Sequence, residues 1–135
     1  MPAGYSGTPL AQKLGYKPGF RVHLDNAPDD YVQLVSPLPD DVQFLIKLTD
    51  ELDLIHVFTD QAKALAPKLK RYMKKIKPAG VIWVSWPKKA SKRPTDITED
   101  VIREVALALG FVDVKVCAVD DVWSGLKLVI RVENR

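Results

Sequence analysis

Polar, aromatic and basic residues follow three apolar segments of this chain, at the points where the segments end. They are Asp25, Asn26, Thr59, Asp60, Ser85, Trp86, Lys88 and Lys89. If the segments are parallel strands, their carboxyl ends meet at one edge of a sheet, where open α/β sheets bind ligands. An aromatic face beside two ammonium groups can hold a phosphate or a base. The alternative is that Trp86 packs on the sheet edge and that the lysines contact only solvent.

A second candidate is a basic segment. Residues 61–93 contain eleven of the chain's twenty lysines and arginines and no acidic residue. This density favours contact with nucleic acid or another polyanion through residues 63–93. The residues expected to make that contact are Lys70, Arg71, Lys74, Lys75, Lys92 and Arg93. The alternative is a solvated helix face that keeps the protein in solution, and no RNA-binding motif accompanies the segment.

Metal and thiol chemistry have weak support. His23 and His56 fall on neighbouring strands, but no third ligand has suitable spacing, so we expect no metal site. The single cysteine, Cys117, excludes an internal disulfide, and no histidine lies near it in the sequence. Buried, hydrogen-bonded histidines and a structural thiol are therefore the expectation.

The elements that position these residues alternate in type. Short apolar segments at residues 21–25, 42–48, 52–58 and 81–86 predict strands, and helical periodicity appears from Asp60 and from Asp96 onward. Pro28 is expected at the first position of another helix, with Asp29 and Asp30 in its first turn. The residues KPAG (77–80) are expected to close the helix that begins at Asp60.

The last two strands, 112–119 and 126–132, flank DDVWSG and predict an antiparallel hairpin. The whole order predicts an α/β, Rossmann-like three-layer sandwich. Its mostly parallel six-stranded sheet should have the order 2-1-3-4-6-5, with an antiparallel last strand. The tryptophan in the hairpin loop, Trp123, could cover the open end of the sheet or contact a second copy in a homodimer.

The bulk composition is that of a globular protein. The 135 residues are 47% hydrophobic and 27% charged with a net charge of +3, which predicts one domain over residues 1–135. No apolar run is long enough to span a membrane, and the beginning, MPAGYSGTPL, does not look like a secretory signal. We therefore expect a cytoplasmic protein without a membrane partner.

Several phrases resemble successive elements of Rossmann-like S-adenosylmethionine-dependent methyltransferases. They are KPGFRVHLD, LDLIHVF, LKRYMKKIKPAGVIWVSWPK and ALGFVDVKV with LKLVIRV. Together with GYSGTPLAQKLGYKPG and WPKKAS, the chain is similar over its whole length to a family of small uncharacterised bacterial proteins, known as a conserved domain of unknown function. This resemblance implies a methyltransferase-like sheet and leaves the activity open.

The chain departs from the methyltransferase pattern at the cofactor positions. That pattern has a glycine-rich turn after the first strand, where only glycine lets the backbone approach the cofactor closely. This chain has Asn26, Ala27 and Pro28 there. The pattern also has an acid at the end of the second strand, whereas the next acids here are Asp50 and Glu51.

We therefore expect a degenerate, non-catalytic methyltransferase-like module that binds or interacts without a cofactor. The alternatives are a methyltransferase that uses S-adenosylmethionine in an altered pose and a nucleic-acid-associated protein. No catalytic residue can be named from the resemblance.

Overall fold

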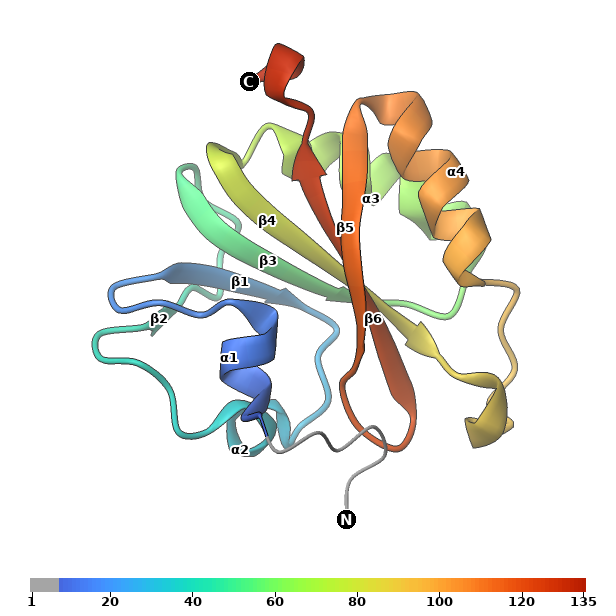
Figure 1. The fold of residues 1–135 in the computed structure, drawn as a ribbon, viewed down its shortest axis with the longest axis horizontal. Helices are drawn as coiled ribbons and strands as arrows, with labels where there is room; N and C mark the ends of the chain where they lie inside the picture. The colour runs from blue at the N-terminus through green and yellow to red at the C-terminus, as the bar shows by residue number, and fades with distance from the viewer. Residues whose placement is uncertain (1–7) are drawn as a thin grey trace.

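A six-stranded sheet lies at the centre of the molecule (Figure 1). The computed structural model describes residues 8–135. The first seven residues of MPAGYSGTPL, which is not expected to be a secretory signal, lie outside the described residues. The strands are β1 (Arg21–Asp25), β2 (Gln43–Phe44), β3 (Leu52–Phe58), β4 (Ile76–Pro87), β5 (Phe111–Ala118) and β6 (Trp123–Ile130). Their order is β2-β1-β3-β4-β6-β5. β1 pairs in parallel with β2 and β3, and β3 with β4, whereas β6 is antiparallel to both β4 and β5. The predicted fold class and strand order are confirmed.

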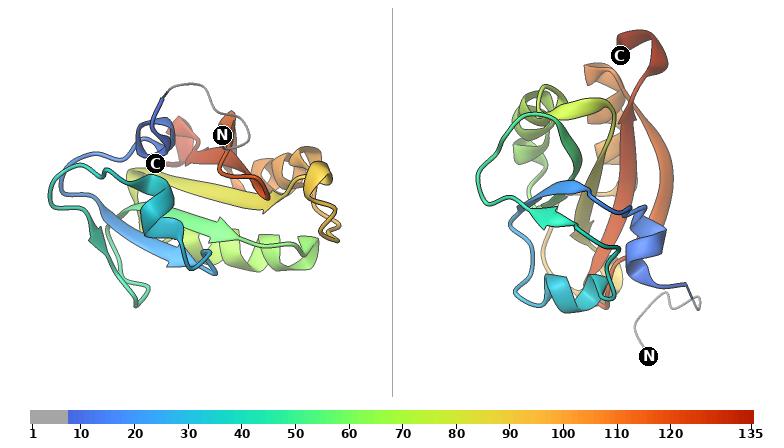
Figure 2. Two further views of the ribbon diagram at one scale, coloured as in Figure 1. Left: turned by 90° about the horizontal axis from the view of Figure 1, so that it is seen from below. Right: turned by 90° about the vertical axis from the view of Figure 1, so that its left-hand side faces the viewer.

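Helices cover both faces of the sheet. The helices are α1 (Leu10–Leu14), α2 (Tyr31–Val35), α3 (Leu65–Met73) and α4 (Glu99–Leu109), with short 3₁₀ turns at η1 (Ala62–Ala64), η2 (Lys89–Ser91) and η3 (Val132–Asn134). Figure 2 shows α1 and α3 on opposite sides of the sheet. Among the described residues, no helix has the length and apolar character needed to cross a bilayer.

Each face has its own buried core. Side chains of α3 and α4, such as Leu69 and Ile102, pack against Leu126 and Leu128 of β6. On the other face, Leu14 of α1 and Tyr31 of α2 pack with Trp83, whose indole nitrogen donates to the Leu14 carbonyl at 2.9 Å. β3 and the second half of β4 are therefore buried on both faces, as expected for parallel strands with continuous apolar sequences.

The second predicted strand is much shorter than expected. Only Gln43 and Phe44 are in β2, although the apolar run extends over 42–48. The Leu45 amide still donates to the Val22 carbonyl at 2.7 Å, but the chain then leaves the sheet and Ile46 is 96% exposed. The apolar run predicts a strand, but after Leu45 the chain has no strand partner, and of its apolar residues Leu48 still packs on the core whereas Ile46 faces solvent.

The prediction that KPAG closes a helix is wrong. α3 ends at Met73, and residues 77–80 form an irregular part of β4, where the pairing with β3 shifts between Leu52/Ile76 and Leu54/Val81. Gly80 is required in this bulge. A Cβ there would lie 2.8 Å from the Ile76 Cβ and 2.9 Å from the Lys77 carbonyl oxygen. The bulge absorbs the extra residues and lets the strand continue.

The predicted start of the second helix is also wrong. α2 begins at Tyr31 with Asp30 as its N-cap, and the Tyr31 amide donates back to the Pro28 carbonyl at 3.0 Å. Pro28 therefore belongs to a turn, and Asp29 and Asp30 precede the helix instead of occupying its first turn. Because α2 has only five residues, its dipole is small, and these carboxylates gain little from interacting with it.

Candidate functional site

The carboxyl ends of β1, β3 and β4 meet at one edge of the sheet, as the sequence predicted. β1 ends at Asp25, β3 at Phe58 and β4 at Pro87. The strand order reverses at β1, because β2 lies on one side of it and β3 on the other. In open α/β sheets the ligand crevice forms at this switch point.

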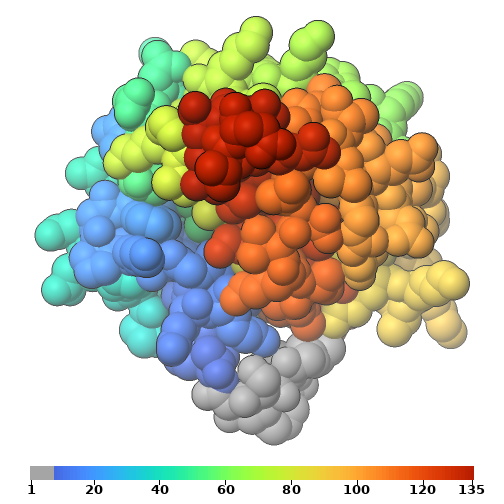
Figure 3. All heavy atoms as spheres, turned by 45° about the horizontal axis from the view of Figure 1, so that its top comes forward, coloured from blue at the N-terminus to red at the C-terminus, as the bar shows by residue number. Residues whose placement is uncertain are grey.

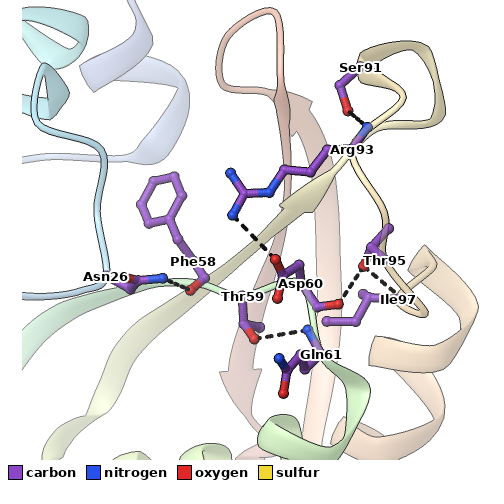
Figure 4. Close-up of polar contacts among 9 residues, drawn as sticks. All are labelled: Asn26, Phe58, Thr59, Asp60, Gln61, Ser91, Arg93, Thr95 and Ile97. Carbon is purple, nitrogen blue, oxygen red and sulfur yellow. Dashed lines mark hydrogen bonds and ion pairs between the residues drawn. The ribbon is translucent and has the colours of Figure 1, made fainter.

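Asn26 bridges the two strands at this crevice. It adopts a left-handed conformation with φ of 60°, which asparagine tolerates better than most residues. Its side-chain amide donates to the Phe58 carbonyl oxygen at 3.4 Å, across the gap between the ends of β1 and β3 (Figure 4). The amide therefore occupies the place where a backbone of glycines would leave room for a ligand.

Asp25 is held by α3. Its carboxylate accepts a hydrogen bond from Lys68 Nζ at 2.7 Å and another from Tyr72 Oη at 2.5 Å, and its side chain is 15% exposed. Burial, and after it the contact with this carboxylate, raises the pKa of Tyr72 far above its usual value. Tyr72 therefore remains a neutral donor, and Asp25 serves to attach α3 to the end of β1.

Ser85 belongs to a buried hydrogen-bond chain. Its hydroxyl lies 2.8 Å from His56 Nε2, and His56 Nδ1 lies 2.9 Å from the Tyr31 hydroxyl, which is 2.7 Å from the Tyr16 hydroxyl. Ser85 and His56 have no exposed surface. Burial lowers the pKa of His56 to about 3, so the imidazole is neutral and has one donor and one acceptor nitrogen. Both nitrogens have partners, and Ser85 is out of reach of a ligand.

Asp60 is fixed by the loop that follows β4. The Arg93 guanidinium donates to the Asp60 carboxylate at 3.2 Å, and the Thr95 hydroxyl donates to the Asp60 carbonyl at 2.8 Å (Figure 4). The Arg93 guanidinium also lies 4.9 Å from the centre of the Trp123 ring. The Asp96 carboxylate accepts from the Ala62 amide at 2.7 Å. These contacts hold the loop of residues 88–98 across the end of β3.

Trp86 and Lys89 line one groove, whereas Lys88 is not among the lining residues of that groove. Trp86 is 8% exposed and belongs to the core under α3 and α4. The Lys88 amide donates to the Val122 carbonyl at 2.8 Å, which ties this loop to the β5–β6 hairpin. Lys89 is exposed and lines a groove of about 560 Å³ together with Trp86, Lys92 and Arg93. The aromatic face and the ammonium groups thus share a groove, although most of the indole is covered.

A neighbouring groove of about 660 Å³ lies beside Asp60, and its lining includes Lys63, Thr95 and Asp96. Thr95 and Pro94 line both grooves.

Four cations of the basic segment have acidic partners from other elements. Lys68 pairs with Asp25, Lys75 with Asp50 at 3.0 Å, Lys77 with Asp53 at 2.9 Å, and Arg93 with Asp60. The acids missing from the segment itself are thus supplied by distant parts of the chain. Within the described residues, exposed cations of the segment without an ion pair remain at Lys63, Lys70, Arg71, Lys74, Lys89 and Lys92.

The remaining candidates have structural surroundings. His23 Nδ1 lies 2.9 Å from the Leu45 carbonyl and the ring faces Tyr72, whereas His56 is on the other face of the sheet, so the two imidazoles do not meet. Among residues 8–135, no cluster of three metal-ligating side chains occurs. Burial raises the pKa of the Cys117 thiol.

Trp123, expected to cover the sheet or contact a second copy, packs on Phe58 of its own chain with ring centres 5.2 Å apart.

Two groups of contacts escaped the sequence. The hydrogen-bond chain from Tyr16 to Ser85 joins the segment after α1 to α2, β3 and β4, and its members are 15, 25 and 29 positions apart in successive pairs. The Arg93 contacts join residues 33 and 30 positions apart. No local pattern marks such pairs. The arginine among the lysines of residues 88–93 is only a weak signal, because arginine is favoured over lysine for bidentate and stacking contacts.

Comparison with known proteins supports the fold and no closer relation. No family model matches the chain, and no curated protein matches it. The chain is similar to a SAM-dependent methyltransferase from Aquifex aeolicus, with a TM-score of 0.65, 18% identity and coverage of 90% of this chain and 87% of the other. It is also similar to a methyltransferase from Pyrococcus furiosus, with a TM-score of 0.59, 13% identity and coverage of 95% and 85%.

A third similar structure is magnesium protoporphyrin IX methyltransferase from Synechocystis PCC 6803 with bound SAM, at a TM-score of 0.59, 10% identity and coverage of 90% and 76%. At these identities the likeness describes the architecture. The chain therefore has a Rossmann-like, methyltransferase-like fold.

Proposed function

We propose that this chain is a methyltransferase-like domain without a working cofactor site, which acts as a non-catalytic binding or interaction module in the cytoplasm. Membership of the small bacterial family that the sequence resembles, and a single domain over residues 1–135, are parts of the same proposal. The observation that carries it is the use of the polar groups at the carboxyl ends of β1, β3 and β4 by the protein itself.

S-adenosylmethionine does not fit these residues. Asn26 bonds to the Phe58 carbonyl in the crevice, and Ala27 and Pro28 follow it in place of glycine. The acid that would hold the ribose is also displaced. Ile46 follows the end of β2, and Asp50 pairs with Lys75 near the opposite end of β3 and β4. In this proposal the crevice offers an adenosyl group neither the glycine backbone nor the carboxylate that the methyltransferase pattern supplies.

Calorimetric titration tests this proposal. We expect no saturable heat when S-adenosylmethionine is added to the protein up to about 1 mM, which corresponds to a binding free energy weaker than about −4 kcal/mol. The methyltransferase from Pyrococcus furiosus provides a fold-matched comparison. A saturable signal in the micromolar range would favour the alternative of a methyltransferase with an atypical cofactor loop.

Polyanion binding is the second candidate, and the outer surface of α3 favours it. Lys70, Arg71 and Lys74 are exposed within five consecutive positions and have no acidic partner among the described residues. Lys63 lies in the turn η1 just before α3, seven positions before Lys70. A group of exposed cations of this kind can contact the phosphates of a nucleic acid strand.

A charge-matched pair of variants tests the polyanion surface. The triple variant K70Q/R71Q/K74Q should weaken binding to a mixed-sequence oligonucleotide and lower the salt slope by about 2, since each lost phosphate contact removes roughly 0.7–0.9. The control K47Q/R131Q/R135Q removes the same charge from positions outside residues 63–93 and should keep the slope. Equal losses of oligonucleotide affinity in both variants, or no binding by the unmodified protein at low salt, would refute the proposal that this surface binds polyanions.

A further inference from the structure

Three lysines lie close together on the face of the sheet that α1 covers only in part. Lys115 and Lys127 are directly opposite each other in the β5–β6 ladder. Lys17, which precedes β1, is close enough to influence the titration of Lys127. None of the three has an ion pair with an acid of the described chain. Like charges directly opposite in a ladder are unfavourable, so the protein maintains this cluster against electrostatic repulsion.

Two of these lysines line a groove of about 400 Å³. One wall is the segment before β1, with Lys17 and Phe20, and the other is β6, with Lys127 and Val129. The start of β4, including the bulge at Gly80, forms the floor. These three segments meet on the face shown in Figure 3. The groove is formed by the first residues of β4, so it is remote from the carboxyl ends described above.

The charge of the groove is not balanced by its own acid. Asp53 is the acidic residue of the lining, and it accepts from Lys77 Nζ at 2.9 Å and from the Arg21 amide at 2.8 Å. Within residues 8–135, Lys17 and Lys127 have no acidic partner. Burial lowers the pKa of Lys127, and repulsion by Lys115 and Lys17 lowers it further. An anion between the two ammonium groups would relieve this repulsion.

The rest of the lining is apolar. Phe20, Ala79, Val81 and Val129 present carbon surface to the groove. A site with two uncompensated ammonium groups and an apolar wall matches a small molecule that carries a phosphate on an apolar or aromatic body. A free polyanion strand is a poorer match, because strands require a line of cations, and this groove concentrates its charge at one place.

We propose that this groove binds a small phosphorylated molecule, with the phosphate held between Lys17 and Lys127 and the remainder lying against Phe20, Val81 and Val129. The site is independent of the crevice at the carboxyl ends of the strands. It gives the proposed non-catalytic module a ligand of defined chemical class.

Titration of pyrophosphate, with phenyl phosphate as a second probe, tests the site. Backbone amide NMR at low salt should show saturable shifts at Phe20, Gly80 and Lys127 for both probes. The variant K127M retains the length and apolar stem of the side chain, and we expect its affinity for both probes to be lower by at least about tenfold. The variant K47M removes one exposed charge from the loop after β2, outside every proposed site, and should bind both probes as the unmodified protein does.

Thermal unfolding supplies an independent readout. Without added anion, K127M should be at least as stable as the unmodified protein, because the variant removes a repulsive charge. Pyrophosphate should raise the Tm of the unmodified protein and leave that of K127M unchanged. The inference is overturned if the unmodified protein binds neither probe, if K47M and K127M lose affinity equally, or if K127M binds both probes as before.

Discussion

Acid should destabilise this protein through His56. In the folded chain, burial holds the pKa of His56 at about 3, whereas a histidine in an unfolded chain has a pKa of about 6.5. As the pH falls below about 6.5, the unfolded chain takes up a proton that the folded chain does not accept. The stability associated with the neutral imidazole is therefore complete above pH 6.5 and is lost progressively down to pH 3.

The size of the effect follows from the difference between the two pKa values. Each pH unit inside this window lowers the free energy of unfolding by up to about 1.4 kcal/mol. Between pH 7 and pH 5, His56 alone should remove about 2 kcal/mol, a large fraction of the roughly 5–15 kcal/mol that stabilises a typical domain. Most carboxylates titrate below pH 5, since their unperturbed pKa values are about 3.9–4.3, so His56 should dominate the change between pH 7 and pH 5.

Urea denaturation at pH 7, 6 and 5 measures this slope. The variant H56Q should be less stable at pH 7, because glutamine cannot reproduce both contacts, but its stability should change less with pH. The variant H23Q removes the imidazole on the other face of the sheet and should keep the slope of the unmodified protein. Equal slopes for the unmodified protein and H56Q would refute the assignment to His56.

Three further substitutions test the packing around the strand ends. G80A should destabilise the fold by about 1–3 kcal/mol in urea denaturation, because the new Cβ would lie 2.8 Å from the Ile76 Cβ; a neutral result would show that the bulge can relax. D25N should cost about 1 kcal/mol, since it removes the charge that Lys68 contacts, and K68M should then add little further loss. R93A should change the free energy of unfolding by less than about 1 kcal/mol, because the pair is largely exposed, yet speed amide hydrogen exchange in residues 88–98. Unchanged exchange in R93A would show that other contacts hold the loop.

The sequence predicted the sheet well because its signals are local. Continuous apolar runs mark β3 and β4, and DDVWSG marks the hairpin, although its last three residues already belong to β6 and the loop is shorter than expected. The prediction failed at β2 and at residues 77–80, because the secondary structure there depends on which other parts of the chain pack on these residues. An apolar run cannot reveal that Ile46 has no neighbour, and the phrase KPAG resembles a helix end although it forms a bulge.

The candidate site was placed correctly in the fold, but the orientations of its side chains were not foreseen. Parallel strands bring Asp25, Asn26 and Asp60 to one edge, and this follows from topology alone. Whether Asp25 faces a crevice or a helix depends on Lys68 and Tyr72, which are 43 and 47 positions away. Such contacts depend on how helix and strand dock, which no spacing in the sequence records.

The central claim is that the switch point between β1 and β3 is closed to an adenosyl group by the chain's own side chains. Amide NMR during titration with S-adenosylmethionine tests it most directly, at Asn26, Phe58 and Asp60. The account predicts that these signals stay in place while any weak, non-specific changes occur elsewhere. Saturable chemical-shift changes at Asn26 and Phe58, together with loss of the hydrogen bond from the Asn26 side chain to the Phe58 carbonyl, would contradict this claim.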